Sequence, residues 1–201
     1  MPVILSGNRT KNSVSAEDYP AFWISATTVI NAEMDAESVR KRLISELLEA
    51  AGFGEATFRI EKKESGKPVL KTDLSESNTL HISFSHTKGL FIAGLCVDRR
   101  IGVDCELPER KVNERLRKRI LSVQCGDTER GIQDLQLWTL KEAFLKMTGT
   151  GLRVAMNRVE ISAPENSQWS YRAKINGEDT RADLLSFLYR NFRISVAVET
   201  G

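Results

Sequence analysis

The sequence predicts an α+β fold in which antiparallel strands pack against a small number of amphipathic helices. Three observations support this class. Asp35 can cap a helix whose apolar positions recur at helical spacing, namely Val39, Leu43, Ile44, Leu47 and Leu48. Apolar and polar residues alternate along several short segments, which is typical of half-buried strands. A longer helical pattern at 132–147 separates the central strands from an alternating C-terminal third.

The individual elements follow from this patterning in chain order. Strands are expected at 22–30, at Phe58 and Ile60, at 80–84, 90–97 and 101–106, around Trp169 and Tyr171, and at 192–198. The helix after Asp35 should end at Gly52 and Gly54, and further helices are expected at 112–121 and 132–147. A turn at 65–68 and polar connections at 85–89, 98–100 and 148–151 join these elements.

Length and charge narrow the class of protein. The 201 residues fit one large domain or two small fused lobes. A net charge of +2 and a pI near 8.4 are too mild for a nucleic-acid-binding protein. Basic residues still gather in three places, at 40–42, 99–100 and 115–119, and such clusters are usually solvated surfaces.

The cysteines, the histidines and the N-terminus bear on location and on metal chemistry. Cys96, Cys105 and Cys125 are odd in number and lack the paired spacing of a zinc site, and two histidines are too few for a histidine-rich metal centre. Residues 1–15 have no sustained apolar region, and no apolar run approaches the roughly 18 residues of a membrane span. We therefore expect a cytoplasmic protein without membrane partners.

The segment Ile101-Gly102-Val103-Asp104-Cys105-Glu106 places two acids on one face of a strand. Side chains alternate along a strand, so Ile101, Val103 and Cys105 should point into the core while Asp104 and Glu106 point the other way. Neighbouring carboxylates repel each other unless a cation lies between them, and magnesium prefers such oxygen ligands. The simpler alternative is a strand end with two solvated acids balanced by an arginine, Arg99 or Arg110.

Three further patterns each allow an ordinary and a functional interpretation. Trp138, Glu142 and Lys146 are four residues apart and share a helix face, where a Glu–Lys surface ion pair is equally common. Ser85-His86-Thr87 could hold phosphate oxygens or could be a polar hairpin. Gly66-Lys67-Pro68 has the residues of a simple turn.

The order of these patterns resembles that of the phosphopantetheinyl transferase superfamily, in its larger, monomeric surfactin-synthetase type. The resemblance rests on Gly-Lys-Pro, a strand ending in Ser-His, Gly-Val-Asp-x-Glu and Trp-x-x-Lys-Glu-Ala-Phe-x-Lys, followed by a glycine-rich turn. It covers about residues 35–152, and the stretch from Trp138 to Lys146 is its most specific part. It implies two similar lobes related by a pseudo-twofold axis, here residues 1–98 and 99–201, with the active site between them.

The resemblance also implies roles for particular residues. Asp104, Glu106 and Glu142 would bind magnesium, Glu142 would also accept the proton of an attacking serine, and Lys146 would neutralise phosphate. Ser85 and His86 match the phosphate-contacting pair, and Lys67 with Pro68 matches the turn beside the adenine of coenzyme A. In the helix after Asp35, Lys41 lies nearest the family's arginine for the 3'-phosphate, with Arg40 and Arg42 as alternatives.

The implied reaction moves 4'-phosphopantetheine from coenzyme A to a serine of an apo acyl or peptidyl carrier protein and releases 3',5'-adenosine bisphosphate. The basic helix at 115–119 is a plausible dock for an acidic carrier. Two alternatives remain open, a magnesium-dependent phosphoester hydrolase that uses Asp104 and Glu106, and an inactive carrier-binding module. Two positions depart from the family pattern. Cys105 replaces an aliphatic residue, and Gln124 stands where an acid is common.

Overall fold

The computed structural model describes residues 3–6, 22–28, 35–64, 66–74, 79–123, 126–163, 170–175 and 180–200. Its α-helices are α1 (Ala36–Ala50), α2 (Glu114–Ile120), α3 (Asp127–Gly131) and α4 (Asp134–Thr148). Its strands are β1 (Val3–Ser6), β2 (Phe22–Thr28), β3 (Phe58–Lys62), β4 (Pro68–Thr72), β5 (Leu80–Thr87), β6 (Leu90–Val97), β7 (Ile101–Glu106), β8 (Val159–Ser162), β9 (Ser170–Ile175), β10 (Arg181–Tyr189) and β11 (Phe192–Glu199). All described strand pairs are antiparallel, which confirms the α+β class.

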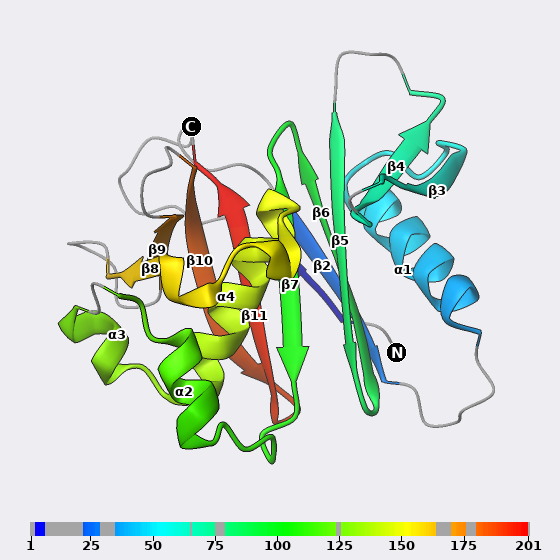
Figure 1. Ribbon diagram of the computed structural model, residues 1–201. Helices are drawn as coiled ribbons and strands as arrows, with labels where there is room; N and C mark the ends of the chain where they lie inside the picture. The colour runs from blue at the N-terminus through cyan, green and yellow to red at the C-terminus, as the bar shows by residue number, and fades with distance from the viewer. Residues whose placement is uncertain are drawn as a thin grey trace, which may run out of the picture.

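Two sheets form the centre of the molecule, with a helix on each outer face (Figure 1). The first sheet has the order β1-β2-β6-β5, the second has the order β7-β11-β10-β9-β8, and β3 and β4 form a separate hairpin. Helix α1 packs on the outer face of the first sheet and α4 on that of the second. The described strands of the first sheet precede Asp98 and those of the second follow Arg100. The division into lobes at residues 98 and 99 stays a prediction.

The alternation of β6 divides the core between these layers. Leu90, Ile92 and Cys96 face the second sheet, where they pack against side chains of β7 and β11. Ala93 and Leu95 face α1 instead. Gly94 lies where the sheets approach closely, since a Cβ there would sit 2.7 Å from Val103 Cγ1. The two sheets therefore share one apolar interface, with buried apolar side chains from both.

Helix α1 begins and packs as its sequence predicts. The Asp35 carboxylate accepts a hydrogen bond from the Ser38 amide at 3.0 Å and so caps the first turn. The buried positions of α1 are the five apolar residues of the predicted stripe, from Val39 to Leu48. Gly52 follows the helix with a positive φ of 84°, a conformation that glycine adopts without steric cost.

The structure also corrects some predicted elements. Residues 85–87 belong to β5 rather than to a polar connection, because they pair with Leu90, Phe91 and Ile92 of β6 and leave only Lys88 and Gly89 as the turn. The predicted helix at 112–121 is shorter and starts after Asn113, whose side chain accepts from the Leu116 amide. Strands β1, β4, β8 and β10 and helix α3 were not predicted. Trp169, Gln124 and Cys125 lie outside the described residues.

No helix in the described part of the chain is long and apolar enough to cross a bilayer.

Candidate active site

Strand β7 presents Asp104 toward α4, as the alternation of its side chains predicts. Ile101, Val103 and Cys105 lie in the apolar interface between the sheets. On the opposite face, Gly102 lies directly under α4, because a Cβ there would come within 2.0 Å of Ala143 O. This close approach sets the distance between β7 and the functional face of α4. Burial raises the pKa of Cys105 to about 12, and its side chain lies in the apolar interface, on the opposite face of β7 from Asp104.

Asp104, Ser85 and Lys146 form one hydrogen-bonded cluster from three elements. Lys146 Nζ on α4 lies 2.8 Å from Asp104 Oδ1 and 2.8 Å from Ser85 Oγ on β5. Ser85 Oγ is in turn 2.9 Å from Asp104 Oδ1. The second carboxylate oxygen, Asp104 Oδ2, is buried and has no partner in this structure. A buried oxygen without a partner is costly, and it marks a position where a further donor or cation would bind favourably.

The edge of β7 is held by side chains of β5 rather than by a backbone ladder. The Val103 amide donates to Ser83 Oγ at 3.1 Å, and the Cys105 amide donates to Ser85 Oγ at 3.3 Å. Ser83 and Ser85 lie two residues apart on β5, and their hydroxyls accept hydrogen bonds from two amides that lie two residues apart on β7. This seam between the sheets places Ser85 beside Asp104.

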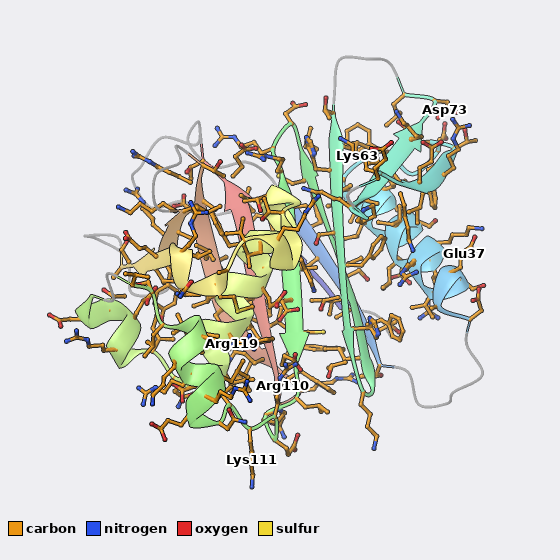
Figure 2. All side chains as sticks on the ribbon, in the orientation of Figure 1. Glu37, Lys63, Asp73, Arg110, Lys111 and Arg119 are labelled. Atoms are coloured by element: carbon orange, nitrogen blue, oxygen red, sulfur yellow. The ribbon has the colours of Figure 1, made fainter. Side chains whose placement is uncertain are left out.

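Trp138, Glu142 and Lys146 share one face of α4 and converge on the end of β7. Arg110, just beyond β7 (Figure 2), stacks its guanidinium 4.5 Å from the centroid of the Trp138 ring and forms an ion pair with Glu106. Burial and the negative charge of Asp104 raise the pKa of Glu142, while Lys146 and Arg110 oppose that rise. Glu142 is therefore close enough to Asp104 for their charges to interact.

The three predicted metal ligands differ in their surroundings. Asp104 and Glu142 interact directly through their charges, whereas Glu106 is engaged by Arg110. Among the residues that the structure describes, no three His, Cys, Asp or Glu side chains form a group ready to hold a metal ion. An additional ligand from Glu106 would require its ion pair with Arg110 to open.

A pocket of about 360 Å³ lies next to this cluster, between the first sheet, the β3–β4 hairpin and the end of α4. Lys146 lines it from one side, and Lys67 and Pro68 line it from the hairpin. Arg40 of α1 also lines it, with its guanidinium 5.9 Å from the centroid of the Phe84 ring. The pocket thus combines basic groups with an apolar wall, as a nucleotide site requires.

Other predicted coenzyme contacts lie around this pocket rather than in its wall. Ser85 reaches it only through Lys146, and His86 is exposed at the end of β5, stacked on Phe91 at 5.1 Å between ring centroids. Lys41 pairs at 2.7 Å with Glu37, which lies on the outer side of α1, away from the sheets (Figure 2). Of the three basic residues at 40–42, Arg40 is the one that lines the pocket.

Sequence reasoning assigned no role to Lys141, which the structure places in a buried ion pair. Its Nζ lies 2.9 Å from Glu129 Oε1 and donates to the carbonyls of Ile120 and Val159 at 2.6 Å each. Both side chains are almost completely buried. Its position in the sequence does indicate burial, because Lys141 lies one helical turn from both Leu137 and Leu145 on the apolar face of α4.

Residues 100–197 match the model of a family described as the 4'-phosphopantetheinyl transferase superfamily. The chain is 32% identical over 117 residues to 4'-phosphopantetheinyl transferase HetI of Nostoc sp. (strain PCC 7120), covering 54% of this chain and 48% of that protein. It is 31% identical over 123 residues to slr0495 of Synechocystis sp. (strain PCC 6803), provisionally named as the same kind of transferase, covering 57% of this chain and 48% of that protein. The chain spans about half the length of these curated relatives.

Proposed function

Because the chain belongs to the 4'-phosphopantetheinyl transferase superfamily, we propose that it transfers 4'-phosphopantetheine from coenzyme A to a serine of an apo carrier protein, as a holo-[acyl-carrier-protein] synthase does. The observation that carries this proposal is the cluster of Asp104, Ser85 and Lys146 beside Glu142, at the edge of a basic pocket. The surfactin-synthetase type, acting as a monomer in the cytoplasm, is part of the same proposal.

The residues of this cluster fit a magnesium ion. Asp104 Oδ2 lacks a partner, and the charge of Asp104 raises the pKa of Glu142, so a cation between the two carboxylates would relieve both costs. Asp104 and Glu142 would hold the ion, joined by Glu106 once it parts from Arg110. When bound, the ion supplies positive charge to the phosphate oxygens of the substrate.

The side chains of this chain account for the remaining chemistry. The carrier serine oxygen forms a bond to the β-phosphorus of coenzyme A, and the bond from that phosphorus to the oxygen of the leaving 3',5'-adenosine bisphosphate breaks. Lys146 stabilises the negative charge on the phosphates. Glu142 takes the serine proton in this proposal, because a carboxylate beside the phosphates can act as a general base.

The pocket supports an assignment for coenzyme A itself. Lys67 and Pro68 lie beside the adenine in this proposal, and Arg40 rather than Lys41 provides the cation for the 3'-phosphate, because only Arg40 of the two lines the pocket. In this proposal His86 contacts phosphate oxygens from the exposed end of β5, and Ser85 would do so once its hydroxyl turns from Asp104 Oδ1. Phe84 beneath Arg40 adds apolar area against which a base can stack.

The test is intact mass spectrometry of apo carrier proteins incubated with coenzyme A and magnesium. Transfer adds the mass of phosphopantetheine to the carrier. Free phosphopantetheine with an unmodified carrier would identify a phosphoester hydrolase instead, and carrier binding without either product would identify an inactive binding module.

Matched variants connect the result to the site. Asp104→Asn and Glu142→Gln should each lower turnover by about 100-fold or more, equivalent to at least ~2.7 kcal/mol of transition-state stabilisation. Lys111→Gln removes an exposed cation outside the pocket and should leave turnover unchanged. Equal activity in all three variants would contradict the proposed site.

A further inference from the structure

A second, larger cavity of about 750 Å³ continues beyond Lys67. It lies between β4, the start of β5 and the segment that follows α4, and it shares Lys67, Pro68 and Gly149 with the coenzyme pocket. The Asp104 cluster is at the opposite end of β5, since His81 near the first residue of the strand lines the cavity and Ser85 does not. The proposed transfer reaction uses none of the residues unique to this cavity.

The wall of this cavity is strongly basic. It contains five cationic side chains and one imidazole, contributed by four separate segments: Lys63, Lys67, Lys71, Arg100, Arg153 and His81. The lining residues within the described part of the chain include no Asp or Glu. The acids nearest to His81 are already engaged, because Glu199 binds Arg100 and Asp98 accepts the Thr79 amide at 2.8 Å.

Burial and the neighbouring positive charges lower two pKa values within the cavity. Burial, followed by the charges of Arg100 and Lys63, lowers the pKa of Lys67 to about 8. Burial and the charge of Lys67 also lower the pKa of His81. Like charges that depress one another in a hollow are stabilised by an anion placed among them.

Some of these groups are already held in position for such a ligand. The Arg153 guanidinium donates to Thr150 O at 3.2 Å and to Gly149 O at 3.1 Å, which fixes it at the rim. A guanidinium has five N–H donors, so others remain to bind phosphate oxygens. Four hydroxyl-bearing residues line the same cavity, namely Thr72, Thr79, Thr148 and Thr150.

We propose that this cavity is a second binding site, for a small phosphate-bearing anion, separated from the coenzyme pocket by Lys67. The inference rests on the cavity, its lining and its charge, and it holds whether or not the chain transfers phosphopantetheine. Pyrophosphate carries several negatively charged oxygens, so one molecule can accept from more than one of these cationic side chains.

The two histidines of this chain provide a direct test with inorganic pyrophosphate as the probe. His81 lines the proposed site, whereas His86 lies at the other end of β5. Imidazole resonances followed by NMR at low ionic strength should show the pKa of His81 rising by at least ~0.5 unit on saturation with pyrophosphate. The pKa shift of His81 should saturate with pyrophosphate concentration independently of any change at His86, and it should weaken with added salt.

Matched variants separate this site from the coenzyme pocket. Lys71→Gln and Arg153→Gln should each raise the apparent dissociation constant of pyrophosphate, measured from the His81 shift, at least ~5-fold. Lys111→Gln should leave that constant unchanged. Lys71 and Arg153 are exposed, so these changes should preserve the fold, which circular dichroism can verify. The proposal would be overturned if pyrophosphate left the pKa of His81 unchanged. It would also be overturned if the His81 shift had the same pyrophosphate dependence as a shift of His86 and persisted in both variants. Transfer to carrier is measured separately by mass, so the two proposals fail independently.

Discussion

Replacement of Lys141 by methionine tests the buried ion pair that anchors α4. The substitution keeps a long apolar chain but removes the ammonium that contacts Glu129 and three backbone carbonyls. Glu129 would keep its hydrogen bonds from the Ser122 and Ile161 amides. It would nevertheless remain a buried carboxylate without a counter-charge, because its residue is only 1% exposed.

The expected cost follows from that remaining charge. Removing one partner of a buried ion pair destabilises proteins by about 3–5 kcal/mol, so we expect a loss of about 4 kcal/mol in the free energy of unfolding. For a chain of this length, that loss corresponds to a decrease of about 8–16 °C in the melting temperature. Because Glu142 adjoins Lys141 on α4, turnover should also fall.

Urea denaturation measures the effect, with two companion variants. Lys141→Met combined with Glu129→Gln should recover at least ~1 kcal/mol relative to Lys141→Met alone, since no buried charge remains. Lys118→Met removes a cation from an exposed pair with Glu114 and should change stability by less than ~0.5 kcal/mol. If the free energy of unfolding of Lys141→Met lies within ~1 kcal/mol of that of the natural chain, the ion pair does not anchor α4.

The same pair gives a pH dependence of definite sign. Burial alone would raise the pKa of Glu129, but the hydrogen bonds from Lys141, Ser122 and Ile161 bring it below its ordinary value. A lowered pKa in the folded state stabilises the protein above the unfolded pKa, and this stability disappears as the pH falls through the folded pKa. The difference in stability between the natural chain and Lys141→Met should therefore narrow below about pH 4.

Three further outcomes are expected. Gly102→Ala should destabilise the protein by about 3 kcal/mol in urea denaturation and lower turnover, because the new Cβ would meet the backbone of α4. In the control Gly131→Ala the new Cβ has open space around it, so stability in urea should change little. His86→Ala should weaken binding of coenzyme A more than binding of dephospho-coenzyme A in calorimetry, and an equal loss for both would argue against a 3'-phosphate contact. Arg115→Glu with Arg119→Glu on α2 should raise the KM for an acidic carrier several-fold at low salt, and an unchanged KM would make this helix an ordinary solvated surface.

The sequence predicted those elements whose pattern depends on local spacing. The stripe of α1, its cap at Asp35 and the alternation of β7 required no knowledge of the partner strands. Strand β10 was missed because it is paired on both sides, by β9 and β11, and its Arg-Ala-Asp-Leu-Leu-Ser-Phe-Leu-Tyr run lacks strict alternation. The extension of β5 through Thr87 was missed because its pairing with β6 outweighs the polar character of these residues.

For the site, motif order identified Asp104, Glu142 and Lys146, which the structure brings into one neighbourhood. The choice among the basic residues of α1 required helix geometry. At about 100° per residue, Arg40 falls in the middle of the apolar stripe and points toward the sheet, whereas Lys41 lies roughly 100° away. The pairing of Glu106 with Arg110 agrees with the alternative that an arginine balances these acids, whereas the burial of Asp104 does not.

The serine seam between β5 and β7 also determines how the pocket can change its width. Opposite walls of the pocket beside Lys146 belong to different layers, with Phe84 on β5 of the first sheet and Lys146 on α4, which packs on the second sheet. The two walls are connected at this edge by the hydroxyls of Ser83 and Ser85, which can exchange acceptors and donors while the ladders within each sheet stay intact. Small shear displacements of packed layers need only such exchanges. Contact between the sheets at this edge therefore depends on two serine hydroxyls, and a ligand that engaged Ser85 would act on that contact directly.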